Sequence, residues 1–242
     1  MTQASDTRLI LPRRGLLQTA AFGGAALLGR AAGAQTPDGP KRRGGVLRFC
    51  RPDPPDMLDP QATNSFSGME YSQMVYDNLT ILDASAQPQP QLATSWTAEN
   101  HGQEWVVTLR EGVTFHDGAP FTSADVAATV ERSLDRARAG AGFGAFGPVR
   151  TVKAEGPAKV RIVMNAPFGE FPVVLAYRAC RMLPRQGIDS LRETPNGTGP
   201  FIFKDFQPGS SLTVERNPKY WDADNIHLDG VRMVFILSLI HI

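Results

Sequence analysis

The chain has 242 residues, of which 42% are hydrophobic, 20% charged and 8% aromatic. That balance is too apolar for a disordered chain and too polar for a protein with many membrane spans. The formal net charge of +1 gives no electrostatic reason to expect a nucleic-acid partner. The composition therefore indicates a folded soluble protein, and its 23 glycines and 19 prolines indicate many turns.

Residues 1–34 have the order of an export signal. Arg13 and Arg14 precede a weakly apolar stretch, and Ala32-Gly33-Ala34 supplies small residues for a cleavage site. The stretch is too short to span a bilayer, and the paired arginines resemble a twin-arginine signal. We expect export through the twin-arginine machinery, cleavage after Ala34 and a periplasmic location. A buried amphipathic helix is the alternative.

The predicted signal holds four of the 25 basic residues and one of the 24 acidic residues, so the remaining chain carries a net charge of −2. No cysteine follows the cleavage site directly, which argues against a lipid anchor at that point. Cys50 and Cys180 lie in predicted strands, where they either pair in an oxidising compartment or stay as buried thiols. Neither they nor the four histidines have metal-ligand spacing, so no metal site is predicted.

The first half of the remaining chain predicts short strands around one helix. Residues 35–45 are polar and rich in Gly and Pro, and indicate a flexible leader. Apolar spacing predicts a helix over residues 68–79. Its buried face would consist of Tyr71, Met74, Val75 and Leu79. Strands are expected at residues 46–50, 80–82 and 105–110, the last with Trp105, Val107 and Leu109 on one side.

A second helix is predicted after Thr122, which forms a capping box with Asp125. The apolar stripe of that helix would be Val126, Val130, Leu134 and Ala137. A glycine-rich loop over residues 140–147 follows, without the Lys-Ser/Thr of a phosphate loop. Its two phenylalanines, Phe143 and Phe146, belong either to a pocket or to a mobile loop.

Hairpins are predicted from residues 149–154 with 159–165, and from residues 201–206 with 212–216. Strands outnumber helices and pair locally. We therefore expect an α+β fold with mixed sheets rather than a regular βαβ series.

Several short motifs occur in a fixed order along the chain. They are Leu58-Asp59-Pro60, Val75-Tyr76-Asp77-Asn78-Leu79, Leu92-Ala93-Thr94-Ser95-Trp96, Phe115-His116-Asp117-Gly118, Gly197-Thr198-Gly199-Pro200-Phe201 and Arg216-Asn217-Pro218-Lys219-Tyr220-Trp221. This ordered set resembles the extracytoplasmic solute-binding proteins of family 5, the peptide, dipeptide and nickel-type binding components of ABC importers. The likeness runs from about Gly44 to Phe235.

The resemblance implies a two-lobed, class II periplasmic binding protein-like fold, with residues 46–236 as the N-terminal part, lobe I. It implies a receptor that binds a peptide or similar small solute between its lobes and delivers it to an inner-membrane ABC permease, with no enzymatic activity and no cofactor. Since complete relatives of this kind are roughly twice as long, we expect a truncated chain that is not competent alone, with residues 237–242 as a non-native tail. The strand expected at residues 228–235 would then lack partners and expose an apolar edge.

The resemblance also implies that the stretch after Leu58-Asp59-Pro60 approaches the ligand. That stretch holds Thr63, Asn64, Ser65 and Phe66, with Met69 behind them. Such short polar and aromatic side chains suit a pocket wall, and an ordinary solvated loop is the alternative. Arg178 and Arg181 are further candidates, since arginine pairs bidentately with a ligand carboxylate. Plain surface charge is the other interpretation of both.

His116, Asp117 and Gly118 look like a catalytic fragment, but a turn closed by the Asp117 side chain explains them better. We predict no catalytic residue. An exported hydrolase is the alternative function, and the absence of G-x-S-x-G and H-E-x-x-H motifs argues against it. A sensor or chaperone outside transport, built on the same fold, also stays open.

Overall fold

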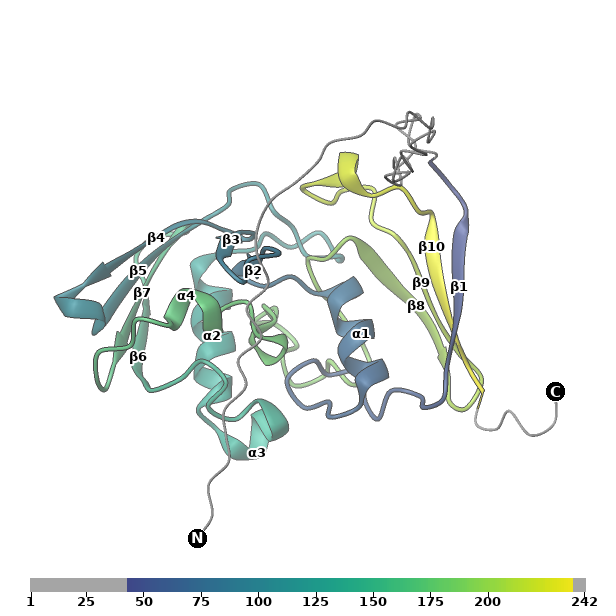
Figure 1. Cartoon of the computed structure of the whole chain (residues 1–242), viewed down its shortest axis with the longest axis horizontal. Coiled ribbons are helices and arrows are strands. Elements are labelled where there is room, and N and C mark those ends of the chain that lie inside the picture. The colour runs from purple at the N-terminus through teal and green to yellow at the C-terminus, as the bar shows by residue number, and fades with distance from the viewer. Residues whose placement is uncertain (1–42, 237–242) are drawn as a thin grey trace, which may run out of the picture. The chain divides into compact units, whose positions relative to one another are not determined.

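The structure, a computed structural model, describes residues 43–236 (Figure 1). The predicted signal with Arg13, Arg14 and the cleavage site after Ala34 lies outside the described residues, as do most of the leader and the tail over residues 237–242. Within the described part, two four-stranded sheets each build a hydrophobic core with a helix. The predicted α+β class with mixed sheets is confirmed.

The first sheet has the order β1-β10-β9-β8. Its strands are β1 (Val46–Arg51), β8 (Phe201–Gln207), β9 (Ser211–Arg216) and β10 (Gly230–Phe235). β10 pairs in parallel with β1 and antiparallel with β9, which makes the sheet mixed. The expectation of an unpaired edge at residues 228–235 is therefore wrong, because β1 covers one side of β10 and β9 the other. The predicted hairpin of β8 with β9 is confirmed.

The second sheet has the order β4-β5-β7-β6 and is antiparallel throughout. Its strands are β4 (Ala93–Glu99), β5 (Glu104–Leu109), β6 (Val149–Ala154) and β7 (Lys159–Met164). Trp105, Val107 and Leu109 are buried on one face of β5 as predicted. β4 was not among the predicted strands, because most of its side chains are small, polar and exposed. A two-stranded sheet joins β2 (Thr80–Leu82) to β3 (Pro88–Pro90).

The first helix, α1 (Phe66–Val75), begins and ends earlier than predicted. It begins at the cap residue Ser65, whose Oγ accepts a hydrogen bond from the Gly68 amide. It ends at Val75 because the backbone of the cap residue Tyr76 is extended, and Asn78 beyond it donates through Nδ2 to the carbonyls of Leu175 and Tyr177. Of the predicted face, Tyr71 and Val75 are buried with the first sheet, whereas Leu79 is buried in the core of the second.

The second helix, α2 (Ser123–Ser133), carries the predicted capping box of Thr122 and Asp125. Val126 and Val130 are buried against the second sheet, but Leu134 and Ala137 are exposed, so half of the predicted stripe is wrong. The helix ends at Ser133, and Asp135 then caps a separate short helix in a new direction. The remaining helical segments are α3 (Arg136–Ala139), α4 (Phe171–Val174), η1 (Asn100–Gly102), η2 (Gly140–Gly142), η3 (Arg178–Cys180) and η4 (Ala223–Asn225).

The two cysteines differ in exposure and do not pair with each other. Cys50 is exposed on β1, and Cys180 is fully buried. Cys180 lies in η3 rather than in a strand, so that prediction is wrong. Burial raises the pKa of the Cys180 thiol, which keeps it protonated and unreactive.

Candidate functional site

The segment that leads into α1 meets two segments far away in the sequence. The glycine-rich loop packs on it so closely that a Cβ on Gly142 would lie 2.8 Å from the Gln61 carbonyl oxygen. The η2 turn of that loop lies against η3, and η3 also lies against α1. The structure thereby groups residues 61–66, residues 140–143 and residues 177–180, which include most of the predicted ligand contacts.

Each of these three segments displays one aromatic ring. Phe66 is 72% exposed, Tyr177 47% and Phe143 42%. They are the large exposed aromatic side chains among residues 43–236. Exposing an aromatic ring to water costs free energy unless another molecule covers the ring. Three exposed rings in adjoining segments therefore indicate a candidate binding surface rather than scattered exposure.

Two arginines stack on two of these rings. The Arg136 guanidinium carbon lies 4.4 Å from the centre of the Phe143 ring, and that of Arg178 lies 5.2 Å from the Tyr177 ring. Both arginines are exposed. Neither has an acidic partner within 4.0 Å in the described part of the chain. We call Phe66, Arg136, Phe143, Tyr177 and Arg178 together the arginine–aromatic surface.

Asp56 holds the predicted ligand loop in shape, a role that the sequence did not reveal. Its carboxylate accepts hydrogen bonds from the Thr63 and Ser65 hydroxyls and from the Asn64 amide at 2.9 Å. Partial burial of Asp56 opposes ionisation, but these hydrogen bonds outweigh it and hold the pKa of Asp56 below its usual value. Thr63 itself is buried, Asn64 is exposed and Ser65 is half-buried.

Gly68 lets this loop close tightly over the start of α1. A Cβ at Gly68 would lie 2.0 Å from the Thr63 Oγ1, so no other residue fits without displacing the loop. Met69, the last of the predicted contacts from this stretch, is half-buried beside it. The loop is therefore preorganised by its own hydrogen bonds, with Phe66 left projecting into solvent.

A buried ion pair anchors the start of the same loop. Asp59 and Arg132 are both almost completely buried, and the guanidinium donates to both carboxylate oxygens of Asp59. Arg132 also donates to the Gln61 side chain at 2.8 Å. The predicted turn at Leu58-Asp59-Pro60 thus fixes the loop to α2, because Arg132 belongs to that helix.

Arg181 does not reach the arginine–aromatic surface. It is buried, and its Nη1 lies 3.3 Å from the Tyr76 carbonyl oxygen. Burial lowers the pKa of the guanidinium to about 10, opposed by the nearby carboxylate of Asp77. Arg181 is therefore an interior cation in this structure, whereas Arg178, three residues earlier, is exposed.

Asp77 is the centre of a buried polar network that sequence reasoning also missed. Its carboxylate accepts from Gln91 at 2.8 Å, from Thr198 at 3.1 Å and from the Tyr220 hydroxyl at 3.1 Å. Burial raises the pKa of Asp77 in spite of these bonds and of Arg181. Asp77, Thr198 and Tyr220 come from three of the motifs quoted above, so the network joins those motifs in space.

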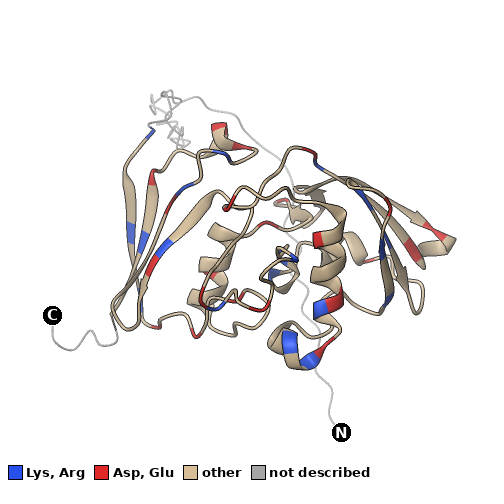
Figure 2. Ribbon diagram, turned by 180° about the vertical axis from the view of Figure 1, so that it is seen from behind, with Lys and Arg blue, Asp and Glu red and all other residues tan. Residues whose placement is uncertain are grey.

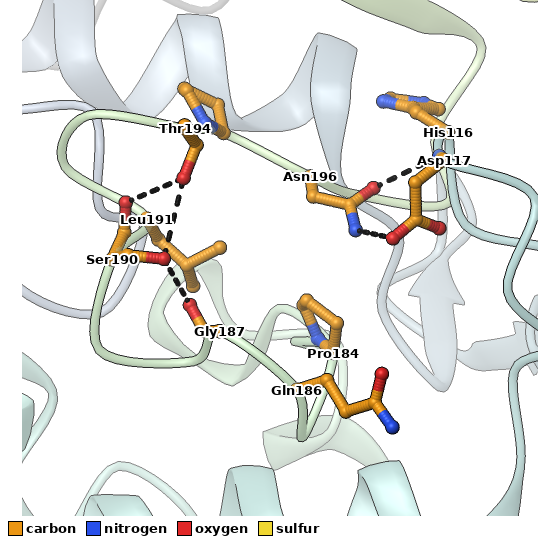
Figure 3. A pocket seen from close by; sticks show the side chains of 10 residues that line it. His116, Asp117, Pro184, Gln186, Gly187, Ser190, Leu191, Thr194 and Asn196 are labelled. Atoms are coloured by element: carbon orange, nitrogen blue, oxygen red, sulfur yellow. Dashed lines mark hydrogen bonds between the residues drawn. The ribbon is translucent and has the colours of Figure 1, made fainter.

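His116 and Asp117 line a polar groove of about 430 Å³ with the loop over residues 184–196 (Figure 3). The predicted turn is confirmed, since Asp117 accepts from the Ala119 amide at 2.9 Å and Gly118 has a φ of +91°. His116 Nε2 lies 3.0 Å from the Gly199 carbonyl oxygen. Because that oxygen only accepts, Nε2 carries the proton, and burial lowers the pKa of the ring against that bond.

Several groups in this groove bond to one another (Figure 3). Asn196 donates to Asp117 at 2.8 Å, and the Thr194 and Ser190 hydroxyls are bonded locally. The His116 Nε2 bonds the Gly199 carbonyl rather than a hydroxyl or thiol. No group of three or more His, Cys, Asp or Glu in residues 43–236 could hold a metal ion. None of the helices formed by these residues has the length and apolar character of a membrane span.

Known proteins resemble the chain at both the sequence and the structural level. The family model described as bacterial extracellular solute-binding proteins, family 5 middle, matches residues 87–238. The glutathione-binding protein GsiB of Salmonella typhi is 27% identical over 178 residues, which cover 72% of this chain and 35% of that protein. The chain thus spans about a third of the length of the curated relatives it matches.

Solved structures of binding proteins are also similar to this chain. The periplasmic binding protein AgaA of A. tumefaciens R10, in complex with agropinic acid, has a TM-score of 0.74 and 26% identity, over 79% of this chain and 40% of AgaA. The oligopeptide-binding protein AppA of Bacillus subtilis, in complex with a nonapeptide, has a TM-score of 0.74 and 25% identity, over 81% of this chain and 40% of AppA.

Proposed function

The chain belongs to family 5 of the bacterial extracellular solute-binding proteins, and from that membership we propose that it serves as a solute receptor of an ABC importer. The solute is a peptide or a similar small molecule, as the glutathione, nonapeptide and agropinic acid in the names of similar proteins suggest. The receptor delivers it to an inner-membrane permease and performs no covalent chemistry. The export signal over residues 1–34 would direct it to the periplasm through the twin-arginine machinery.

The three grouped segments, residues 61–66, 140–143 and 177–180, form the proposed wall of the solute site. Its support is the preorganised loop, in which Asp56 binds Thr63, Asn64 and Ser65 and leaves Phe66 projecting. A loop already fixed in shape loses little conformational entropy when a solute binds, which favours affinity. Asp56 is therefore a positioning residue, and Asn64, Ser65, Phe66 and Met69 are the contacts we expect from this stretch.

The proposal is tested by asking whether the 242-residue chain binds a solute at all. Native mass spectrometry of the purified chain would identify a co-purified molecule, and a thermal-shift panel would include glutathione, short peptides, opines and nickel complexes. Since the chain is not expected to be competent as a receptor alone, we expect only weak binding at millimolar solute to the surface that the described residues supply. A solute at ten times its Kd stabilises the folded state by about 1.4 kcal/mol, enough to raise the Tm measurably. A chain that carries no solute and responds to none of the panel would contradict the proposal.

The same panel separates binding from hydrolysis. Mass spectra of the peptides after incubation are expected to show them intact, whereas cleavage products would favour the exported hydrolase. Deletion of a neighbouring permease gene is expected to abolish uptake of the identified solute. Uptake that continues unchanged would favour the sensor or chaperone.

Asp56→Asn tests the wall itself. Asparagine keeps one acceptor oxygen, but its amide nitrogen cannot accept the bonds made to the second carboxylate oxygen, so the loop is expected to loosen and the thermal shift by the solute to shrink. Asp83→Asn is the matched control, because Asp83 also closes a turn, with the Ser85 and Gln87 amides, but lies outside the proposed wall. Equal loss of solute response in both variants would contradict a specific role for Asp56.

A further inference from the structure

The arginine–aromatic surface points to the chemical class of the solute, an inference that rests on the proposed receptor function. We infer that Arg178 and Arg136 bind a carboxylate of an anionic solute, while the rings beneath them contact an adjoining apolar part. Two observations carry this inference: the stacking of both guanidinium groups on exposed rings, and the lack of acidic partners for them in the described chain.

Several other arginines of the described chain are held by carboxylates, unlike Arg136 and Arg178. Arg132, Arg138, Arg161 and Arg216 each have carboxylate partners within 3.2 Å. Arg161 alone contacts Glu99, Glu104 and Glu155. Arg136 and Arg178 are held by rings instead, which restrains each guanidinium without using its N–H donors. Those donors face water and are free for an anion.

Stacking also prepares these groups for binding. A guanidinium that lies on a ring loses little further rotamer freedom when a carboxylate arrives, and its planar fork matches the two carboxylate oxygens. The two pairs are neighbours, because Phe143 directly follows η2, Tyr177 directly precedes η3, and these two segments lie against each other. The short helix α3 holds two basic residues, Arg136 and Arg138, and Figure 2 shows blue on this helix.

Three of the acidic residues near these pairs are held by other groups. Asp135 is occupied as the cap of α3, accepting from the Ala137 amide at 2.9 Å. Asp189 is held by Arg138 at 3.0 Å, and Asp56 by the three donors of the loop. Phe66 extends the apolar part of the surface at the start of α1. A solute with a carboxylate beside an aromatic or aliphatic group therefore fits better than a neutral polyol or a cation.

The test compares an acid with its amide on the complete 242-residue chain. The probes are N-acetyl-phenylalanyl-alanine and its C-terminal amide, titrated to millimolar concentration with protein-observed NMR. We expect the acid to bind about tenfold more tightly than the amide, as a charge-assisted bidentate pair allows. Arg178→Gln and Arg136→Gln are each expected to reduce that ratio, and the double variant to abolish it. Arg192→Gln removes an exposed arginine elsewhere and is expected to leave the ratio unchanged.

The outcomes separate this inference from the receptor function. Equal binding of acid and amide, or an acid preference that survives in the double variant, would overturn the inference while the receptor function stands. The same holds if the chain binds neither probe but binds another solute of the thermal-shift panel. If the chain binds none of the solutes tested, both the receptor function and this inference are contradicted. Thermal unfolding of each variant excludes loss of fold, since neither arginine has a buried partner.

Discussion

The polar interior and the arginine–aromatic surface use the same kind of residue in opposite ways. Arg132 in the interior is surrounded by protein acceptors, and Asp59 takes both of its terminal nitrogens. Arg178 at the surface rests on Tyr177 and keeps its donors toward water. The difference teaches that a buried arginine must be paired within the protein, whereas an exposed arginine can remain available for another molecule.

The largest effect is expected from breaking the interior pair. Arg132→Met would leave the Asp59 carboxylate buried without its cation, and we expect the free energy of unfolding to fall by about 3–5 kcal/mol. Urea unfolding followed by circular dichroism measures this. Arg138→Met is the control, because the pair of Arg138 with Asp189 is exposed and worth at most about 1 kcal/mol. Similar losses in the two variants would show that burial does not govern the value of the pair.

A second contrast lies within the glycine-rich loop, where one phenylalanine is buried and the other exposed. Phe146→Ala is expected to cost about 3 kcal/mol, the low end for such a cavity, since the glycines beside it let the loop relax. Phe143→Ala is expected to change stability by less than about 0.5 kcal/mol. Thermal unfolding of the two variants checks both numbers. Comparable destabilisation by the two substitutions would mean that the Phe143 ring is held by more than Arg136.

Features that depend on nearby residues could be predicted from the sequence, and features that depend on distant residues could not. The turn at Leu58-Asp59-Pro60, the capping box of Thr122 and Asp125 and the alternation from Trp105 to Leu109 were predictable, because each depends on residues a few positions apart. The strand pairing of β1 with β10 was not, since it joins residues more than 180 positions apart.

The location of the candidate site stays a prediction from the resemblance, and the contacts that shape it could not be predicted from the sequence. The resemblance pointed to residues 63–66, but the role of Asp56 depends on the chain folding back over seven to nine residues without any periodic pattern. Arg178 and Arg181 look alike in the sequence, as do Phe143 and Phe146. Which member of each pair is buried depends on how the glycine-rich loop and η3 pack against each other, and that packing is tertiary.

The smallest expected effect concerns His116, which lies between the interior and the groove. Burial lowers the pKa of its ring below the unfolded value near 6.5, and a protonated Nδ1 would be a buried donor without an acceptor in the described chain. Between the two pKa values the unfolded state binds more protons, so stability rises with pH there. The contribution of His116 is complete above the unfolded pKa and is lost as the pH falls through the folded pKa.

His116→Gln isolates this contribution, because the glutamine amide still donates to the Gly199 carbonyl but does not titrate. We expect the native chain to lose more stability than the variant as the pH falls from 7 to 5, by urea unfolding at each pH. The difference between the two chains is the relevant quantity, since Asp77, whose pKa is raised, opposes the trend equally in both. Parallel pH profiles would mean that the ring is hydrated enough to accept its proton, and that His116 belongs with the surface residues rather than with the interior.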